Sequence, residues 1–205
     1  MKFSIISGAP DQSSDFLKNN IDLNSFIIAA DSGYIHSKNA GITPDLIVGD
    51  FDSSVMPQDS ENILQLPKIK NDTDTFYCIK EAIKRGADEI EIFCAIGSRA
   101  DHSYSNLLAL NYCLDNNVKA KIVDSKNIIS VHNKSFEIHK SEFKYFSLFA
   151  FIEDVEGLTI TGAAYNLNNK TILVSDPLGQ SNEFKDNKVN IDFKKGKIML
   201  ILSND

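Results

Sequence analysis

The N-terminal half of the chain alternates short apolar runs with segments of helical spacing, and this alternation restricts the fold more than any other feature. Each run is too short for a helix and reads as a buried strand. Strands that are apolar throughout and alternate with helices predict a mostly parallel sheet with helices on both faces. The expected strands are residues 3–7, 26–30, 46–48, 88–95 and 118–124.

From about Asn127 the helical spacing disappears, and short strands separated by turn residues replace it. Evenly spaced short strands predict an all-β sandwich or barrel. We therefore expect an α/β class chain, with an α/β domain over residues 1–125 and a β-sandwich domain over residues 126–205. The expected strands are residues 128–132, 135–139, 145–151, 158–161, 171–175, 188–193 and 197–202, with a turn at Asn168-Asn169 and a hairpin at Lys194-Lys195-Gly196.

The 205 residues carry a formal net charge of −7. Such a chain lacks the large basic face that a general nucleic-acid binder needs. Because Arg85 and Arg99 are its only arginines, an acidic protein of this kind would need metal ions to handle a polyphosphate.

The three cysteines, Cys78, Cys94 and Cys113, include no C-x-x-C pair. Their odd number, and the apolar surroundings of Cys94 and Cys113, predict buried, reduced thiols in a cytoplasmic protein rather than disulfides or a zinc site. The N-terminal residues do not have the pattern of a signal peptide, and no segment has the length of a membrane-spanning helix.

The segment from Pro44 to Ser54, P-D-L-I-V-G-D-F-D-S-S, places two acids where the third expected strand ends. Alternate residues of an extended segment face the same way, so Asp50 and Asp52 should project together. Adjacent carboxylates repel unless a cation lies between them, and Mg²⁺ is typically held by one or two carboxylates plus substrate phosphates. The segment predicts a metal site, with an Asx-turn that caps the next element as the alternative.

Another acid, Asp31, follows the second expected strand, and ligands of parallel sheets collect outside the carboxyl ends of the strands. A further group, Lys70 to Thr75, precedes a helical pattern in which Asp72 or Thr73 is the expected N-cap. Asp74 falls in the first turn, and helix N-termini bind phosphate. This helix start is expected to bring a metal and a nucleotide together, although Asp72 could serve only as a cap.

A second strand-to-helix junction contains Gly97, Arg99, Asp101 and His102, ahead of a helix expected over residues 102–114. Gly97 lets the backbone approach a phosphate, Arg99 offers a charged fork, and Asp101 can orient Arg99 or His102. In the alternative, Asp101 is an N-cap and His102 a surface residue of the first turn. We assign a function to Arg99.

Taken in order, these segments resemble the thiamine pyrophosphokinase family. That family carries A-D-x-G, P-D-x-x-x-G-D-F-D-S and D-x-T-D segments, a G-x-R-x-D-H junction before an asparagine-containing helix, and a late S-N-E segment. The resemblance spans nearly the whole chain, and G-D-F-D-S together with R-x-D-H is specific. The matching residues are Ala30-Asp31-Ser32-Gly33, 44–53, Asp72-Thr73-Asp74, 97–102 with Asn106, and Ser181-Asn182-Glu183.

The chain departs from the family pattern at three places. Ser32 and Ser98 replace glycines that are common in the family. Ala163-Ala164-Tyr165 stands where a larger motif with an aromatic residue is usual, so Tyr165 is the expected substitute in the thiamine pocket. From chemistry alone, the late segment 179–184 would read as an ordinary polar loop.

The resemblance implies an α/β domain followed by a β-sandwich, and transfer of an intact pyrophosphoryl group from ATP to the hydroxyl of thiamine. It also implies Mg²⁺ as cofactor, release of AMP, and a homodimer with active sites between the subunits. The general base would be Asp74 or Asp101. The implied metal residues are Asp50, Asp52 and Asp74, with Asp72 further out; the nucleotide residues are Asp31, Lys70, Thr73, Arg99, Asp101 and His102; and the thiamine residues are Ser181 and Asn182.

Three other readings compete with this one. A haloacid-dehalogenase-like phosphatase would use Asp50 as a nucleophile, but it gives R-x-D-H no role. A pyrophosphokinase could act on a different alcohol such as a hydroxymethylpterin, although the S-N-E segment and the β domain favour thiamine. A nucleotide- or metal-sensing module would use the acids for binding only.

Overall fold

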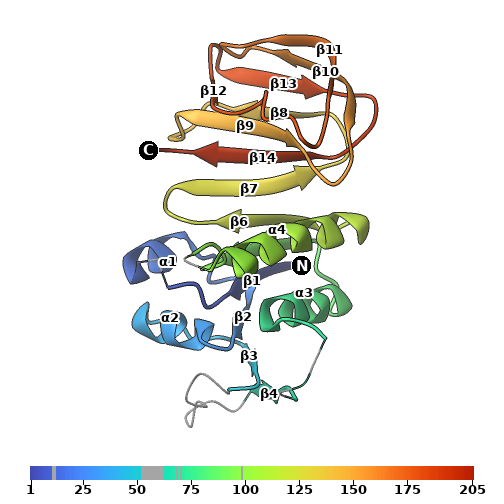
Figure 1. The fold of residues 1–205 in the computed structure, drawn as a ribbon. Coiled ribbons are helices and arrows are strands. Elements are labelled where there is room, and N and C mark those ends of the chain that lie inside the picture. Colours follow the sequence, from blue (N-terminus) through green and yellow to red (C-terminus); the bar gives the residue numbers. More distant parts are fainter. Residues whose placement is uncertain (11–12, 52–61, 68, 70, 98) are drawn as a thin grey trace. The chain divides into compact units, whose positions relative to one another are not determined.

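The computed structural model describes residues 1–205 apart from 11–12, 52–61, 68, 70 and 98. The described chain divides into two units, Met1–Ser125 and Lys126–Asp205 (Figure 1). Among the described helices, none combines the length and apolar character needed to cross a membrane.

The strands of the first unit lie in the order β6-β5-β1-β2-β3-β4, and each paired neighbour is parallel. In β1, β2 and β5, every residue except the first is buried, as expected for strands with helices on both faces. The sequence did not predict β4, which has only three residues. The bounds are β1 Lys2–Ile6, β2 Phe26–Ala30, β3 Leu46–Gly49, β4 Ile63–Gln65, β5 Glu89–Phe93 and β6 Lys119–Val123.

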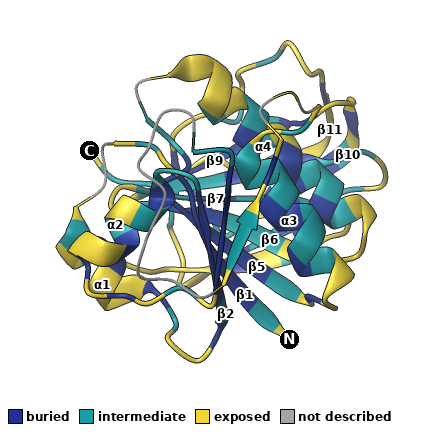
Figure 2. Ribbon diagram, turned by 90° about the horizontal axis from the view of Figure 1, so that it is seen from below, coloured by how far each residue is buried: buried dark blue, intermediate teal, exposed yellow. Residues whose placement is uncertain are grey.

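Two pairs of helices cover these strands, with α1 and α2 on one side and α3 and α4 on the other (Figure 2). Hydroxyl groups cap α1 and α3: Ser13 accepts the N–H of Phe16, and Thr73 accepts that of Phe76. This arrangement confirms the predicted α/β half of the fold. The bounds are α1 Ser14–Asn20, α2 Gly33–Asn39, α3 Asp74–Lys84 and α4 Ala100–Asp115.

The strand order reverses at β1, which pairs with β2 on one side and with β5 on the other. Backbone hydrogen bonds continue this contact beyond the strands, from the N–H of Ser7 to the carbonyl of Phe93 and from that of Ala9 to Cys94, both at 2.8 Å. In open parallel sheets, ligands bind in the crevice beside such a reversal. The topology therefore places a binding crevice between the carboxyl ends of β1 and β5.

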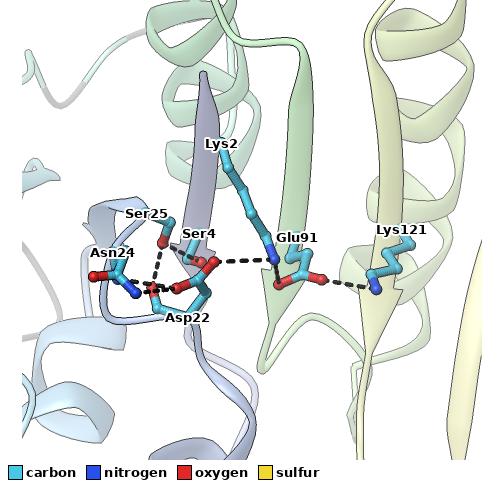
Figure 3. A network of polar contacts seen from close by, with 7 residues as sticks. All are labelled: Lys2, Ser4, Asp22, Asn24, Ser25, Glu91 and Lys121. Carbon is cyan, nitrogen blue, oxygen red and sulfur yellow. Dashed lines mark hydrogen bonds and ion pairs between the residues drawn. The ribbon is translucent and has the colours of Figure 1, made fainter.

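A buried carboxylate links three neighbouring strands (Figure 3). Glu91 of β5 lies 3.1 Å from the Nζ atom of Lys2 in β1 and 2.7 Å from that of Lys121 in β6. Lys2 also reaches Asp22, at 3.4 Å, in the segment between α1 and β2. Because two ammonium groups flank the Glu91 carboxylate, its burial does not leave an uncompensated charge.

The second unit consists of two antiparallel sheets, ordered β12-β9-β14-β7 and β11-β10-β13-β8. Their facing side chains form one buried cluster that includes Phe146, Leu148 and Leu200 from the first sheet and Ile160 and Ile191 from the second. This is the predicted all-β domain. The bounds are β7 Asn127–His132, β8 Phe136–His139, β9 Tyr145–Ala150, β10 Val155–Thr161, β11 Leu167–Ile172, β12 Asn182–Glu183, β13 Lys188–Asp192 and β14 Ile198–Ser203.

Two local predictions for this unit are wrong. Lys194-Lys195-Gly196 is not a hairpin, because β13 pairs with β10 and β8 whereas β14 pairs with β7 and β9. The segment instead pairs with Glu156, which exchanges backbone hydrogen bonds with Lys194 and Lys195 as the chain changes sheets. A turn that contains glycine can connect two strands of different sheets as readily as it can form a hairpin.

The second error concerns β11, which contains the predicted turn Asn168-Asn169 and ends before most of the predicted strand 171–175. Asn169 has φ 48°, and the pairing of β10 with β11 shows register shifts. The two asparagines therefore mark an irregularity inside a strand, since asparagine tolerates the left-handed region in bulges and in turns alike.

Candidate active site

A cleft of about 500 Å³ lies at the carboxyl ends of β1, β2 and β5. Its walls come from the residues that follow these strands and from the first turns of α3 and α4. This is the crevice that the reversal of strand order predicts. Five predicted nucleotide or metal residues line it together: Asp31, Thr73, Asp74, Arg99 and His102.

The first turn of α3 is fixed to β1 by a pair of hydroxyl groups. The Oγ atom of Ser7, which is buried, lies 2.9 Å from the Oγ1 atom of Thr75. Asp74 lies between this anchor and the capping residue Thr73, so the helix start holds its carboxylate at the cleft. A carboxylate in a first helical turn also interacts favourably with the helix dipole.

Asp72 has a different environment from Asp74. Its carboxylate oxygens lie 2.9 and 2.8 Å from the Nζ atom of Lys80, one helical turn and more along α3. The same ammonium group lies 4.7 Å from the ring centre of Phe76. Lys80 thus neutralises Asp72 and ties the segment before α3 to the helix. Among the described residues that line the cleft, Asp72 does not appear.

Arg99 and Asp101 form a two-pronged ion pair at the start of α4. The Nη2 and Nε atoms of Arg99 lie 2.6 and 3.2 Å from the two carboxylate oxygens of Asp101. The N–H of His102 also donates to Asp101, at 3.0 Å. The alternative in which Asp101 is the N-cap is wrong, because Arg99 occupies that position and α4 begins at Ala100.

The hydrogen bonds from Arg99 lower the pKa of the Asp101 carboxyl to about 2. Since this pKa lies below its ordinary value, the pair contributes to stability at neutral pH and loses its contribution only as the pH falls toward about 2. A base with so low a pKa would accept a proton poorly from an alcohol near neutral pH.

This leads to a prediction for the pH dependence. An acid limb of kcat/KM between about pH 5 and about pH 8 reports a group of the free enzyme that titrates there, and Asp101 does not. We expect Asp101→Asn to leave the position of such a limb unchanged while it weakens ATP binding. The measurement is kcat/KM for ATP against pH in both proteins; a limb that disappears in the variant would identify Asp101 as the base.

Asp31 and Asp50 directly follow β2 and β3, so both lie at the carboxyl ends of the parallel strands. The N–H of Asp31 donates to the carbonyl of Val48 at 2.7 Å, and Asp50 follows two residues later. A Cβ atom on Gly49 would lie 3.1 Å from the Cα atom of Asp31, so glycine permits this approach. Two other predicted residues, Asp52 and Lys70, lie outside the described part of the chain.

The donors around the cleft suit a hard divalent cation in company with phosphates. Asp31 and Asp74 supply carboxylates, and serine and threonine hydroxyls lie beside them. Within the described residues, no group of three or more His, Cys, Asp or Glu side chains could hold a metal ion. The two carboxylates of Asp31 and Asp74 are of the kind that Mg²⁺ uses when it takes its other ligands from water and substrate.

Sequence reasoning did not identify several residues that line the cleft: Ser7 to Pro10 after β1, Cys94 and Ala95 after β5, and Ser103 on α4. For the residues after β1 and β5, the signal was their position after apolar runs, which becomes informative only once the strand order is known. Burial raises the pKa of the Cys94 thiol to about 12, so this cysteine is not a nucleophile near neutral pH.

In the second unit, the predicted acceptor residues differ in their surroundings. Ser181 is exposed, and its N–H donates to the Oγ atom of the buried Ser147 at 2.9 Å. Asn182 is buried. Its Oδ1 atom accepts the N–H of Tyr165 at 3.0 Å and that of Glu183, and its Nδ2 atom donates to the carbonyl of Tyr165 at 2.8 Å. Tyr165 is 71% exposed. Asn182 thus holds two segments together while Ser181 and Tyr165 face outward.

Comparison with known proteins gives matches in both units. Residues 17–122 match the family model described as thiamin pyrophosphokinase, catalytic domain, and residues 134–198 match thiamin pyrophosphokinase, vitamin B1 binding domain. The thiamine pyrophosphokinase of Bacillus subtilis (strain 168) is 32% identical over 211 residues, which cover 98% of each chain.

Solved structures agree with this assignment. A crystal structure of thiamine pyrophosphokinase from Bacillus subtilis matches with a TM-score of 0.91 and 30% identity over 100% of both chains. One of thiamin pyrophosphokinase from Geobacillus thermodenitrificans matches with a TM-score of 0.86 and 26% identity over 100% of this chain and 98% of the other. The sequence, the fold and the relatives together establish that this chain is an enzyme of the thiamine pyrophosphokinase family.

Proposed function

We propose that this enzyme transfers the intact pyrophosphoryl group of ATP to the hydroxyl of thiamine. The thiamine oxygen would form a bond to the β-phosphorus, and the bond from that phosphorus to the oxygen bridging it to the α-phosphorus would break. The electron pair of that bond leaves on AMP, and the proton of the hydroxyl passes to a base. The observation that carries this proposal is the cleft, which joins Asp31 and Asp74 with Arg99 at the switch point of a parallel sheet.

The N-termini of α3 and α4 would have different roles toward the triphosphate. At α4, the guanidinium of Arg99, which Asp101 orients through their ion pair, and the helix N-terminus would donate to the phosphate oxygens. At α3, Asp74 supplies a carboxylate; Asp31 also lines the cleft, and Asp50 follows the end of β3. These acids would hold Mg²⁺, which supplies charge neutralisation along the polyphosphate when it is bound.

Positioning and electrostatic stabilisation carry most of the rate in phosphoryl transfer generally. The low pKa of Asp101 favours Asp74 over Asp101 as the group that receives the hydroxyl proton. Lys70, Thr73 and His102 remain proposed nucleotide residues, and Asp52 a proposed metal ligand, on the strength of the sequence motifs.

The acceptor side is proposed to lie in the second unit, where Ser181 and Tyr165 are exposed. The side chain of Asn182 holds the backbone of Tyr165, and the hydroxyl of Ser147 holds that of Ser181. We also propose the homodimer implied by the family resemblance, with the active sites between subunits. The buried cysteine thiols support the expected cytoplasmic location. A different acceptor alcohol and a phosphatase with an Asp50 nucleophile are not favoured, because both family matches name thiamin pyrophosphokinase.

Ser181→Ala tests the acceptor assignment. Loss of one hydrogen bond to the substrate should raise the KM for thiamine about 3- to 10-fold and leave the KM for ATP nearly unchanged. Steady-state kinetics with each substrate varied in turn provide the measurement, and Ser175→Ala, at another exposed serine of the same unit, is the control. Equal effects of Ser181→Ala on the two KM values would remove Ser181 from the acceptor pocket.

The proposed reaction is tested by incubation of the enzyme with ATP, Mg²⁺ and thiamine. We expect AMP and thiamine diphosphate in equal amounts, and no AMP when thiamine is omitted. A hydroxymethylpterin in place of thiamine should give no comparable product. Release of inorganic phosphate without any acceptor would instead indicate the phosphatase.

A further inference from the structure

We infer that Ser103 and Asn106 of α4 are positioning residues for the reaction, because they fix the turn that presents Arg99 to the cleft. This inference rests on the proposed function for its choice of ligand, ATP. Neither side chain needs to touch the substrate to act in this way. We call the described residues 94–97 and 99 the β5–α4 turn.

The backbone of the β5–α4 turn begins in an unusual conformation. Cys94, which directly follows β5, has φ 52°, a region that residues other than glycine seldom occupy. Conformations of this kind persist only where the surrounding structure determines them. On one side, the carbonyl of Cys94 accepts the N–H of Ala9 at 2.8 Å, which ties the turn to the end of β1.

On the other side, α4 holds the turn through Asn106. Asn106 is 8% exposed, and its Nδ2 atom donates to the carbonyl of Ala95 at 2.8 Å. A buried carbonyl that lost this donor would keep its desolvation cost without a partner. The bond therefore favours the backbone conformation that brings the carbonyl of Ala95 within reach of Asn106.

Ser103 holds the next part of the turn, three residues earlier on the same face of α4. Its Oγ atom accepts the N–H of Gly97 at 3.1 Å and lies 3.2 Å from the carbonyl of Arg99. Ser103 and Asn106 line the cleft, and their bonds to Gly97 and Ala95 join the helix to the turn. Together they determine where Arg99 leaves the turn and enters α4.

The consequence is a coupling between Asn106 and Arg99. If Asn106 acts by placing Arg99, its removal should weaken ATP binding only where Arg99 is present. A purely structural role would weaken binding by the same factor whether or not Arg99 is present.

A double-mutant cycle tests this coupling, with MgATP binding measured by calorimetry in the absence of thiamine. We expect Asn106→Ala to raise the Kd for MgATP about 10-fold in the otherwise unchanged enzyme and less than about twofold in Arg99→Ala. Asn111→Ala is the matched control, because Asn111 lies on the same helix and bonds to Asp115. It should leave the Kd unchanged.

Ser103 provides a second test if Asn106→Ala does not fold. Ser103→Ala should weaken MgATP binding, and Ser103→Thr, which keeps the hydroxyl, should restore it. Equal factors in the two backgrounds of the cycle, or no effect of Asn106→Ala and Ser103→Ala, would overturn the inference alone. An enzyme that binds MgATP with the predicted coupling but makes no thiamine diphosphate would overturn the proposed function alone, whereas failure to bind MgATP at all would overturn both.

Discussion

Asp74→Asn is expected to lower kcat by roughly 10³-fold while the fold remains intact. Asparagine keeps the size of the side chain and a ligand oxygen but removes the negative charge that would hold a divalent cation at the start of α3. Metal ions supply several kcal/mol of charge stabilisation in reactions of this kind, and each tenfold loss of rate corresponds to about 1.4 kcal/mol. The measurement is kcat at saturating ATP, thiamine and Mg²⁺, with circular dichroism as the check on folding.

Asp15→Asn is the matched control for this variant, because Asp15 is also an acid in the first turn of a helix, α1. It should retain normal activity. Asp50→Asn is expected to resemble Asp74→Asn. An Asp74→Asn enzyme with activity within a few-fold of normal at ordinary Mg²⁺ would remove Asp74 from the metal site.

Gly33→Ala is expected to destabilise the first unit by at least about 3 kcal/mol. A Cβ atom at this position would lie 2.0 Å from the carbonyl oxygen of Ile6 and 2.9 Å from that of Ser7. These are backbone atoms at the end of β1, so a side-chain rotation cannot relieve the clash. For a chain of this size, the loss should lower Tm by roughly 6–12 °C in a thermal melt.

Gly41→Ala separates this clash from the general cost of replacing glycine. Gly41 follows α2 with φ 70°, and nothing lies within 4 Å of the position its Cβ atom would take. Only the left-handed backbone penalty applies there, about 1 kcal/mol. A smaller loss of Tm for Gly33→Ala than for Gly41→Ala would show that α2 does not pack on β1 in the described way.

Much of the fold could be predicted from local patterns. The runs that became β1, β2 and β5 are buried along nearly their whole length, and continuous burial is what distinguishes strands of a parallel sheet from strands of an antiparallel one. The cap of α3 was narrowed to Asp72 or Thr73, and Thr73 fills it, because a hydroxyl or carboxylate just before a helix accepts a free N–H group whatever the tertiary structure.

Features that depend on partners distant in the sequence could not be predicted. The turn at Gly196 connects strands of different sheets, and nothing local distinguishes such a turn from a hairpin. The sequence placed Asp72 before the helix and Asp74 in its first turn, but it could not show that Lys80 pairs with Asp72. The residues after β1 gained significance only when β5 proved to be its neighbour.

The most direct test of the account follows the phosphorus atoms. The enzyme would be given thiamine, Mg²⁺ and ATP that carries separate isotopic labels at the β- and γ-phosphorus. Transfer of the intact pyrophosphoryl group predicts both labels in thiamine diphosphate, in equal amounts, together with unlabelled AMP. Formation of ADP that retains the β label, with only the γ label in the thiamine product, would contradict it.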